Sequence, residues 1–393
     1  MLNKPQHVEK SIHTITTTDD LANHCARWAT EIYITVDTEF LRETTYYPKL
    51  CLIQVAGAHE AALIDPLADG LDLAPFFALM ADTNVLKVFH AAKQDFEILV
   101  MLSGALPQPI IDTQIAAMVC GFGDQVGYEA IARKLAGANI DKSSQFTDWS
   151  RRPLSHKQQA YAVSDVTHLR TVYEKLQEQL AQTDRRDWMK SELDSLTDPA
   201  TYRVDPEQSW RRVKARIQNK KQQAVLMSVA AWREREAQNK NVPRGRVLKD
   251  EAIAEIAIQM PQTPQDVNDL RLVSRGAGNS SMGAAILKAV QDGLSRDPKT
   301  IPDKTKFDDM SSAALAASEI LKLALKIVCD MHSLAPKLIA SSADIEALAM
   351  DDEADIPAMR GWQFELFGKV ALELKHGKAC ITMEKGKAVI EKR

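Results

Sequence analysis

Apolar and polar residues in the first 180 positions alternate between the two-residue repeat of β-strands and the 3.6-residue repeat of α-helices. Runs rich in branched and aromatic residues predict strands at 32–40, 49–56, 61–66 and 85–90, and a short extended stretch at 110–113. Helical spacing predicts helices at about 18–29, 73–80, 93–102, 114–140 with a break near residue 121, and 155–180. We therefore expect residues 1–182 to form one α/β domain, a mixed sheet with flanking helices. Its first three strands would form an antiparallel meander.

The rest of the chain is predicted to be mainly helical. Residues 183–204 resemble a connector, and proline- and glycine-containing breaks divide residues 205–296 into several short helices. A linker at 297–302 leads to a third unit, residues 305–393. Its end, 379–390, is predicted to be a β-hairpin that turns at Lys385-Gly386.

Length and composition are those of an ordinary globular protein. The 393 residues allow two or three domains, with 45% hydrophobic and 26% charged residues. No run of eighteen apolar residues predicts a membrane span, and the N-terminus lacks the apolar core of a signal peptide, so a cytoplasmic protein is expected. The five cysteines are scattered, without the paired spacing of a zinc ribbon or a disulfide framework.

Charge is distributed unevenly although the net charge is only −4. Residues 203–249 contain thirteen Lys and Arg against four Asp and Glu. Such a basic segment suits a protein that holds a polyanion. A pair of solvated basic helices explains it equally well.

Two carboxylates, Asp37 and Glu39, follow the apolar half of the strand at 32–40. Residues i and i+2 of a strand share a face, so the two acids should lie side by side. Like charges held together need a cation, and a divalent metal with oxygen ligands is the simplest one. The alternative is that both acids mark the point where the strand leaves the core.

Further acids occur on two predicted helices. Asp95 lies in the first turn after the strand at 85–90, where the helix dipole alone would favour an acid. Tyr161 and Asp165 are four residues apart and share a helix face, although this pair alone is compatible with an ordinary surface contact. Four acids from three elements can converge at one strand end, and two divalent ions require such a set of oxygen ligands. Tyr161 could orient a water molecule, whereas its ordinary pKa makes it a poor base.

The same stretches resemble the motifs of the DEDD superfamily of 3′–5′ exonucleases, Tyr subtype, and within it the bacterial ribonuclease D family. The resemblance extends over residues 15–180 and rests on segments 36–40, 46–54, 90–95, 111–114, 148–154 and 161–165. The His subtype would carry a histidine where Ala160 stands. Residues 205–296 are similar to an HRDC domain, a helical nucleic-acid-binding module, with the likeness carried by Val242–Glu251. Residues 305–393 stand where the family has a second HRDC-like domain.

The resemblance implies a ribonuclease H-like exonuclease domain, followed by two mainly α-helical HRDC-like domains. It also implies that two divalent ions, Mg²⁺ or Mn²⁺, are bound by four acids and that Tyr161 places the nucleophile. The metal-binding acids are Asp37, Glu39, Asp95 and Asp165.

The expected activity is 3′–5′ trimming of RNA ends, such as those of precursor tRNA, with release of 5′-mononucleotides. Thr38, Phe40 and His90 are candidates to hold the terminal nucleotide, although His90 could equally be a packed strand-end residue. Two alternatives remain at this point: a DNA exonuclease with the same metal site, and a binding module without catalysis. Nothing in the sequence requires more than a monomer.

Overall fold

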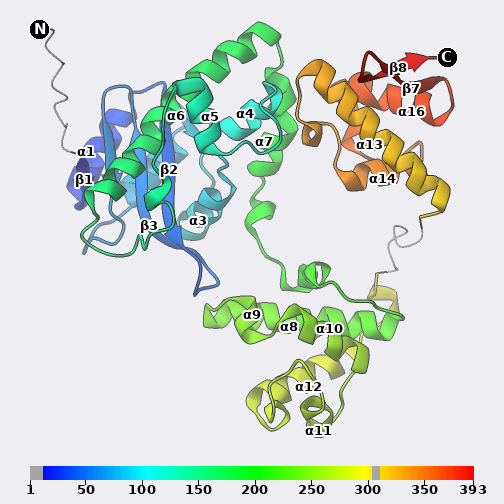
Figure 1. Cartoon of the computed structure of the whole chain (residues 1–393). Coiled ribbons are helices and arrows are strands. Elements are labelled where there is room, and N and C mark those ends of the chain that lie inside the picture. Colours follow the sequence, from blue (N-terminus) through cyan, green and yellow to red (C-terminus); the bar gives the residue numbers. More distant parts are fainter. Residues whose placement is uncertain (1–11, 303–309) are drawn as a thin grey trace, which may run out of the picture. The chain divides into compact units, whose positions relative to one another are not determined.

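The computed structural model describes residues 12–302 and 310–393, and its amino-terminal part is an α/β domain (Figure 1). The starts of the predicted first and third domains, residues 1–11 and 305–309, lie outside this description. The elements of the α/β domain are β1 His13–Ile15, α1 Thr18–Trp28, β2 Tyr33–Leu41, β3 Lys49–Ala56, β4 Ala61–Ile64, α2 Ala74–Ala81, β5 Leu86–Phe89, α3 Lys93–Ser103, β6 Ile110–Asp112, α4 Thr113–Val119, α5 Tyr128–Ala136 and α6 His156–Thr183.

The six strands form one mixed sheet in the order β1-β4-β3-β2-β5-β6. β1 pairs with β4, β2 with β5, and β5 with β6 in parallel, whereas β3 and β4 are antiparallel. The predicted mixed sheet is confirmed, and β2, β3 and β4 are neighbours as a meander requires. The edge strand β1 was not predicted. Because β2 and β5 are parallel, the segments that follow them emerge at the same edge of the sheet.

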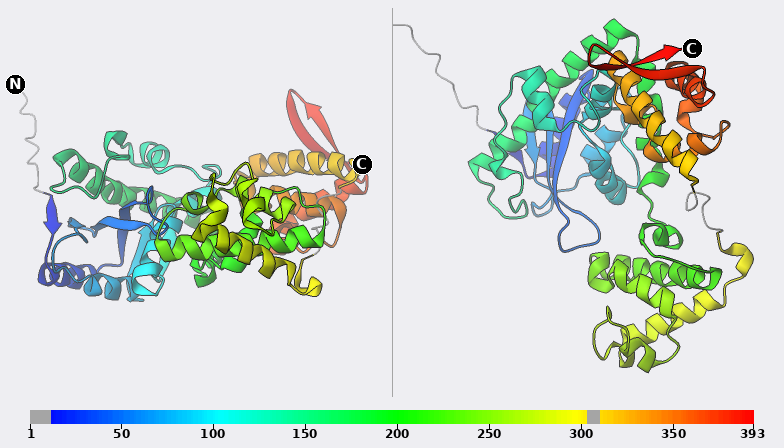
Figure 2. Two further views of the ribbon diagram at one scale, coloured as in Figure 1. Left: turned by 90° about the horizontal axis from the view of Figure 1, so that it is seen from below. Right: turned by 45° about the vertical axis from the view of Figure 1, so that its right-hand side comes forward.

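Helix caps and apolar stripes explain how the helices cover this sheet. Thr17 caps α1, and Leu21, Cys25 and Trp28 on its inner face are buried. Ser155 and Gln158 form a capping box at the start of α6. Figure 2 shows α6 on one side of the sheet and α1 on the other. Fully buried aromatic side chains fill the core, among them Phe76, Phe89, Phe96 and Trp149.

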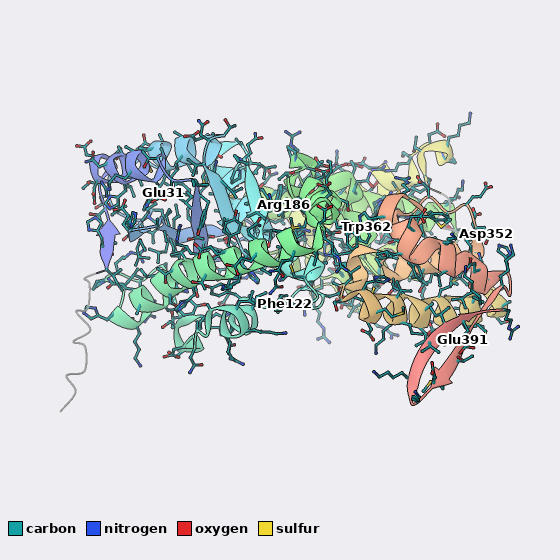
Figure 3. All side chains as sticks on the ribbon, turned by 90° about the horizontal axis from the view of Figure 1, so that it is seen from above. Glu31, Phe122, Arg186, Asp352, Trp362 and Glu391 are labelled. Carbon is teal, nitrogen blue, oxygen red and sulfur yellow. The ribbon has the colours of Figure 1, made fainter. Side chains whose placement is uncertain are left out.

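The carboxyl-terminal part packs against the α/β domain, with which it forms one compact unit, whose described residues are 12–39, 50–199 and 310–393. Trp362, which is labelled in Figure 3, stacks on Trp188 with ring centroids 4.3 Å apart, and the amide of Ala335 donates to the carbonyl of Met118 at 3.1 Å. The elements outside the α/β domain in this unit are α7 Lys190–Leu196, α13 Ser312–His332, α14 Ser342–Met350, α15 Gly361–Gln363, a π-helical turn Phe364–Gly368, α16 Lys369–Lys375, β7 Ala379–Glu384 and β8 Lys387–Lys392. The predicted hairpin is therefore present, with a turn at Lys385-Gly386.

The described residues of the second unit are 40–49 and 200–302. Its helices are α8 Lys220–Lys240, α9 Arg244–Val247, α10 Asp250–Gln259, α11 Pro264–Asn268 and α12 Ser281–Leu294. A core of small and branched apolar side chains joins them, with Val225, Val229, Ile253, Ile256 and Ile286 fully buried. Over the described ranges of both units, every helix is too short or too polar to cross a bilayer.

Candidate active site

The end of β2 places the first two candidate ligands. In the pairing of β2 with β5, Thr35 lies opposite Val88, so Asp37 lies level with the segment that leads into α3. Asp37 and Glu39 are both half-buried and, two residues apart on a strand, share one face. The predicted side-by-side placement of the two acids therefore follows from the observed strand.

The four candidate acids influence one another electrostatically. Burial raises the pKa of Glu39 to about 10, with further contributions from Asp37, Asp165 and Asp95. Burial and the nearby Asp165 raise the pKa of Asp37 to about 8. The pKa of Asp95 is raised by burial and then by Asp37. These four carboxylates therefore lie close enough to interact, and the site that they form is called the acidic pocket below.

Asp95 is positioned by a direct contact with Thr38 of β2 and, through the start of α3, by Asp112 at the end of β6. The hydroxyl of Thr38 donates a hydrogen bond to its Oδ1, which ties α3 to the end of β2. Asp112, itself buried, accepts hydrogen bonds of 2.9 Å from the amides of Ala91 and Ala92, just before α3 begins. Ala91 has a φ of 58°, a conformation that non-glycine residues rarely adopt. Asp112 therefore acts as a positioning residue for the helix that carries Asp95.

Helix α6 presents Tyr161 and Asp165 to the same pocket. The hydroxyl of Thr35 on β2 donates to the carbonyl of Val166 at 2.8 Å and fixes α6 against the strand. Burial raises the pKa of Asp165 to about 7, and a hydrogen bond from Tyr161 acts in the opposite direction. Burial and the carboxylates of Asp165, Glu39 and Asp37 raise the pKa of Tyr161, so its hydroxyl stays protonated at neutral pH.

One buried atom in this pocket lacks a partner. Asp165 Oδ1 is buried and makes no hydrogen bond to any described residue. A buried acceptor without a donor is costly unless a cation faces it. Oxygen ligands alone suit Mg²⁺ or Mn²⁺. The residues present therefore fit a divalent cation, although the oxygens of the four acids are not gathered within 4.8 Å of one another as those of a closed single-ion site would be.

Tyr128, at the start of α5, is a neighbour of the site that sequence reasoning missed. Its hydroxyl donates to the main-chain carbonyl of Asp165. Burial, together with Asp165 and Asp37, raises its pKa. The only sequence signal was an aromatic residue at a helix start, which is too common to indicate a site. Tyr128 therefore supports the main chain of α6 at Asp165.

The three residues predicted to contact the substrate, Thr38, Phe40 and His90, differ from one another in burial and hydrogen bonding. Both ring nitrogens of His90 are engaged, Nδ1 with the hydroxyl of Thr113 at 2.9 Å and Nε2 with the carbonyl of Val126 at 3.0 Å. Burial lowers its pKa, which favours the neutral ring. The hydroxyl of Thr38 donates its hydrogen bond to Asp95, and Phe40 is half-buried near the end of β2. This geometry favours His90 as a packed residue; the nucleotide contacts of all three stay predictions.

Arg152, in the loop that precedes α6, has a structural role. Its guanidinium donates two hydrogen bonds of 2.6 Å to Asp65 and one of 2.6 Å to the carbonyl of Cys51. Arg151 is exposed and pairs with Asp148 at 3.2 Å.

Comparisons with known proteins agree with this architecture. Residues 12–181 match the sequence model of the 3′–5′ exonuclease family, and residues 222–290 match that of the HRDC domain. The fold and the site therefore define an exonuclease with an appended HRDC domain.

Relatives that align with nearly the whole chain identify the family within this class. Ribonuclease D of Nitrobacter hamburgensis is 51% identical, with 95% of this chain and 98% of the relative covered. Ribonuclease D of Jannaschia sp. is 48% identical, with 96% and 99% covered. The crystal structure of Escherichia coli RNase D, described as an exoribonuclease involved in structured RNA processing, has a TM-score of 0.81 at 30% identity and covers 93% of this chain and 99% of its own. The chain belongs to the ribonuclease D family of exoribonucleases.

Proposed function

We propose that this protein hydrolyses RNA from its 3′ end, releases 5′-mononucleotides, and trims precursor tRNA as a monomer. Asp37, Glu39, Asp95 and Asp165 would hold two divalent cations, Mg²⁺ or Mn²⁺. The observation that supports this proposal is the cluster of four acids from β2, α3 and α6, in which acidic neighbours help to raise the pKa values of Asp37, Glu39 and Asp95, and a buried oxygen of Asp165 is unpaired.

Bare carboxylates would repel a phosphodiester, so the pocket needs cations before it can accept an RNA end. The bound cations would supply charge neutralisation and an activated nucleophile. The chain itself would place the reacting groups. Tyr161, whose pKa is raised by burial and by its acidic neighbours, would donate or accept a hydrogen bond that orients the attacking water. Thr38 and Asp112 would keep Asp95 in place through the contacts described above.

Exposed basic residues of the helical unit would hold the body of the RNA. Some basic side chains in 203–249 form ion pairs within the protein, as Arg233 does with Asp250 and Arg235 does with Glu207. Other basic side chains are exposed to solvent: Arg212, Lys214, Arg216, Lys221, Arg246 and Lys249. Contacts from such residues to phosphates weaken as salt rises.

A time course on a tRNA transcript with a few extra 3′ nucleotides tests this function. We expect stepwise shortening with Mg²⁺ or Mn²⁺, 5′-mononucleotides as products, and no reaction with EDTA or in Asp165→Asn. A DNA oligonucleotide matched in sequence to a short linear RNA distinguishes the sugar preference. Equal degradation of both would favour the DNA-exonuclease alternative, and internal cleavage products would contradict an exonuclease.

A further inference from the structure

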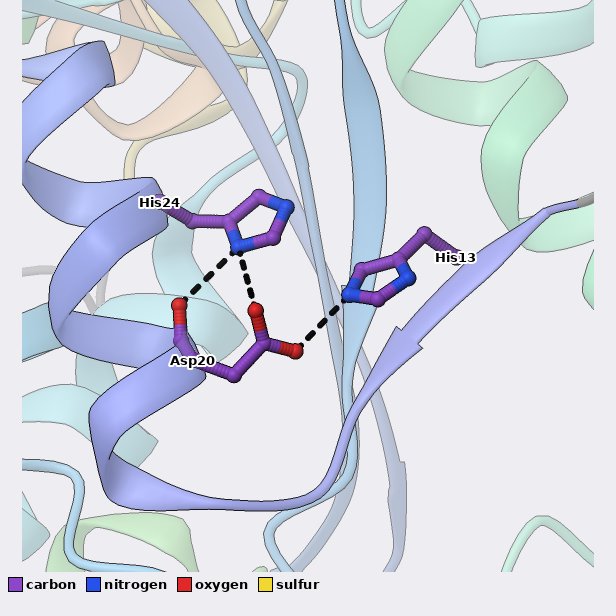
Figure 4. A group of neighbouring side chains, drawn as sticks. All are labelled: His13, Asp20 and His24. Atoms are coloured by element: carbon purple, nitrogen blue, oxygen red, sulfur yellow. Dashed lines mark hydrogen bonds and ion pairs between the residues drawn. The ribbon is translucent and has the colours of Figure 1, made fainter.

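A second cluster of metal-ligating side chains lies where β1 meets α1, on elements that contribute no residue to the acidic pocket. His13 of β1 and Asp20 and His24 of α1 place their ligand atoms within 4.8 Å of one another (Figure 4). The cluster contains two imidazoles and one carboxylate, whereas the acidic pocket offers carboxylates. Imidazole nitrogens with a carboxylate suit Zn²⁺ better than Mg²⁺.

The spacing of these atoms is close to that around a zinc ion. Nε2 of His13 lies 2.8 Å from Oδ2 of Asp20, and Nδ1 of His24 lies 3.1 Å from Oδ1 of the same carboxylate. Bonds of about 2.0–2.1 Å in a tetrahedral site separate neighbouring ligand atoms by roughly 3.3 Å. The two rings stack with centroids 4.9 Å apart and planes inclined by 14°. A small opening of the cluster would therefore admit the ion.

The groups behind His24 resemble the outer shell of a metal site. Oε2 of Glu60 lies 3.9 Å from Nε2 of His24, on the side of the ring away from Asp20. Arg27 holds this carboxylate through two hydrogen bonds, of 2.8 and 2.9 Å. A carboxylate beside the distal nitrogen orients a metal-bound histidine and increases its basicity.

We propose that His13, Asp20 and His24 form a zinc site that fastens β1 to α1. Without zinc, Nδ1 of His24 is within hydrogen-bond distance of the main-chain carbonyl of Asp20, at 2.9 Å. Zinc takes the lone pair of Nδ1, and the ring carries its proton on Nε2, facing Glu60. Both imidazoles stay neutral, so neither releases a proton. The fourth position faces solvent, because half of the His13 side chain is exposed.

Calorimetric titration of the metal-free full chain with Zn²⁺ tests the site. Millimolar Mg²⁺ is present throughout to occupy the acidic pocket. We expect one additional Zn²⁺ per chain in the wild type, and at least about tenfold weaker binding in His13→Gln and Asp20→Asn. His156→Gln, which removes an exposed histidine of α6, is the matched control and should bind as the wild type does.

Two measurements keep the result interpretable. Both substituted residues are partly exposed, so their variants should melt in EDTA at nearly the wild-type temperature, which excludes misfolding as the cause of weak binding. The visible spectrum with Co²⁺ in place of Zn²⁺ should show nitrogen and oxygen ligands without the intense near-ultraviolet band of a thiolate. Equal zinc affinity in all four proteins, no zinc uptake by the wild type, or a thiolate band would overturn the proposal.

Discussion

An ion pair between a buried carboxylate and a partly exposed arginine in the helical unit provides a quantitative test of the structure. Glu234 on α8 has no exposed surface, and Nε and Nη2 of Arg244 donate to its two oxygens at 2.6 Å each. The hydroxyl of Tyr46 donates to the same carboxylate and accepts from Arg244 at 2.9 Å. Asn241 Oδ1 accepts from the amides of Tyr46 and Tyr47 at 3.1 and 3.0 Å. The segment 40–49, which follows Glu39 directly, is therefore held to α8 by this network.

The expected loss in the free energy of unfolding depends on which partner of the ion pair is removed. Arg244→Met leaves a fully buried carboxylate with only neutral donors, which should cost about 3–5 kcal/mol in the free energy of unfolding. Tyr46→Phe keeps the ion pair and removes one hydrogen bond to a charged group, at a cost of about 1.5–3 kcal/mol. The double variant Glu234→Leu/Arg244→Met removes both charges, so it should be less destabilised than Arg244→Met alone.

Hydrogen exchange of α8 amides, measured by mass spectrometry, reports the local free energy of opening in each variant. Urea unfolding followed by circular dichroism gives the global effect. The double variant is the control, because it separates loss of the pair from the presence of an unpaired charge. An Arg244→Met cost below about 1 kcal/mol, or a double variant as unstable as Arg244→Met, would contradict this prediction.

The remaining predictions concern the pocket, the sheet and the basic surface. Tyr161→Phe should lower kcat with unchanged Mn²⁺ binding by calorimetry; loss of metal binding would assign the residue a different role. Without metal, the raised pKa values of Asp37 and Glu39 mean that the folded state holds more protons than the unfolded one between about pH 4 and pH 8. In EDTA the melting temperature should therefore fall as pH rises through this range, and Mg²⁺ should reduce that slope; an equal slope with and without Mg²⁺ would contradict a metal site here. Lys87→Met removes an ammonium that donates to the carbonyls of Asp82, Val85 and Gln108 at 2.6–2.9 Å, and should destabilise the fold by about 2–4 kcal/mol in urea unfolding. Burial lowers the pKa of Lys87 to about 8, so the unfolded state binds more protons than the folded state from about pH 8 to 10.4. The wild type should therefore gain stability relative to this variant as pH rises through that window. A constant difference in stability between the two proteins would argue against the lowered pKa. Replacing Arg212, Lys214 and Arg216 with Gln should raise KM for long RNA and flatten its salt dependence, and should leave a dinucleotide substrate unaffected; an equal effect on the dinucleotide would contradict a role in holding the RNA body.

Local patterns in the sequence were sufficient for the elements that carry the candidate site. Asp37 and Glu39 follow from the two-residue repeat of a strand, and Tyr161 and Asp165 follow from the four-residue spacing of a helix. Their convergence with Asp95 was an expectation supported by family resemblance, since neither spacing says how β2 and α6 pack.

Features that depend on distant contacts were missed. β1 has three residues, too few for a periodic signal, and it exists through pairing with β4 about fifty residues later. Arg152 is hydrogen-bonded to Asp65, which lies 87 positions earlier in the chain, so its structural role could not be predicted from the loop that contains it. Tyr128 reaches Asp165 only because α5 packs on α6, and the docking of Ala335 against Met118 depends on tertiary packing in the same way.

The central claim is that four acids hold paired divalent cations. A crystal of the full chain soaked in Mn²⁺ tests it through anomalous scattering. We expect two peaks, roughly 3.5–4 Å apart, coordinated by Asp37, Glu39, Asp95 and Asp165. Peaks elsewhere, or Asp95 and Asp165 turned away from any ion at the end of β2, would contradict it.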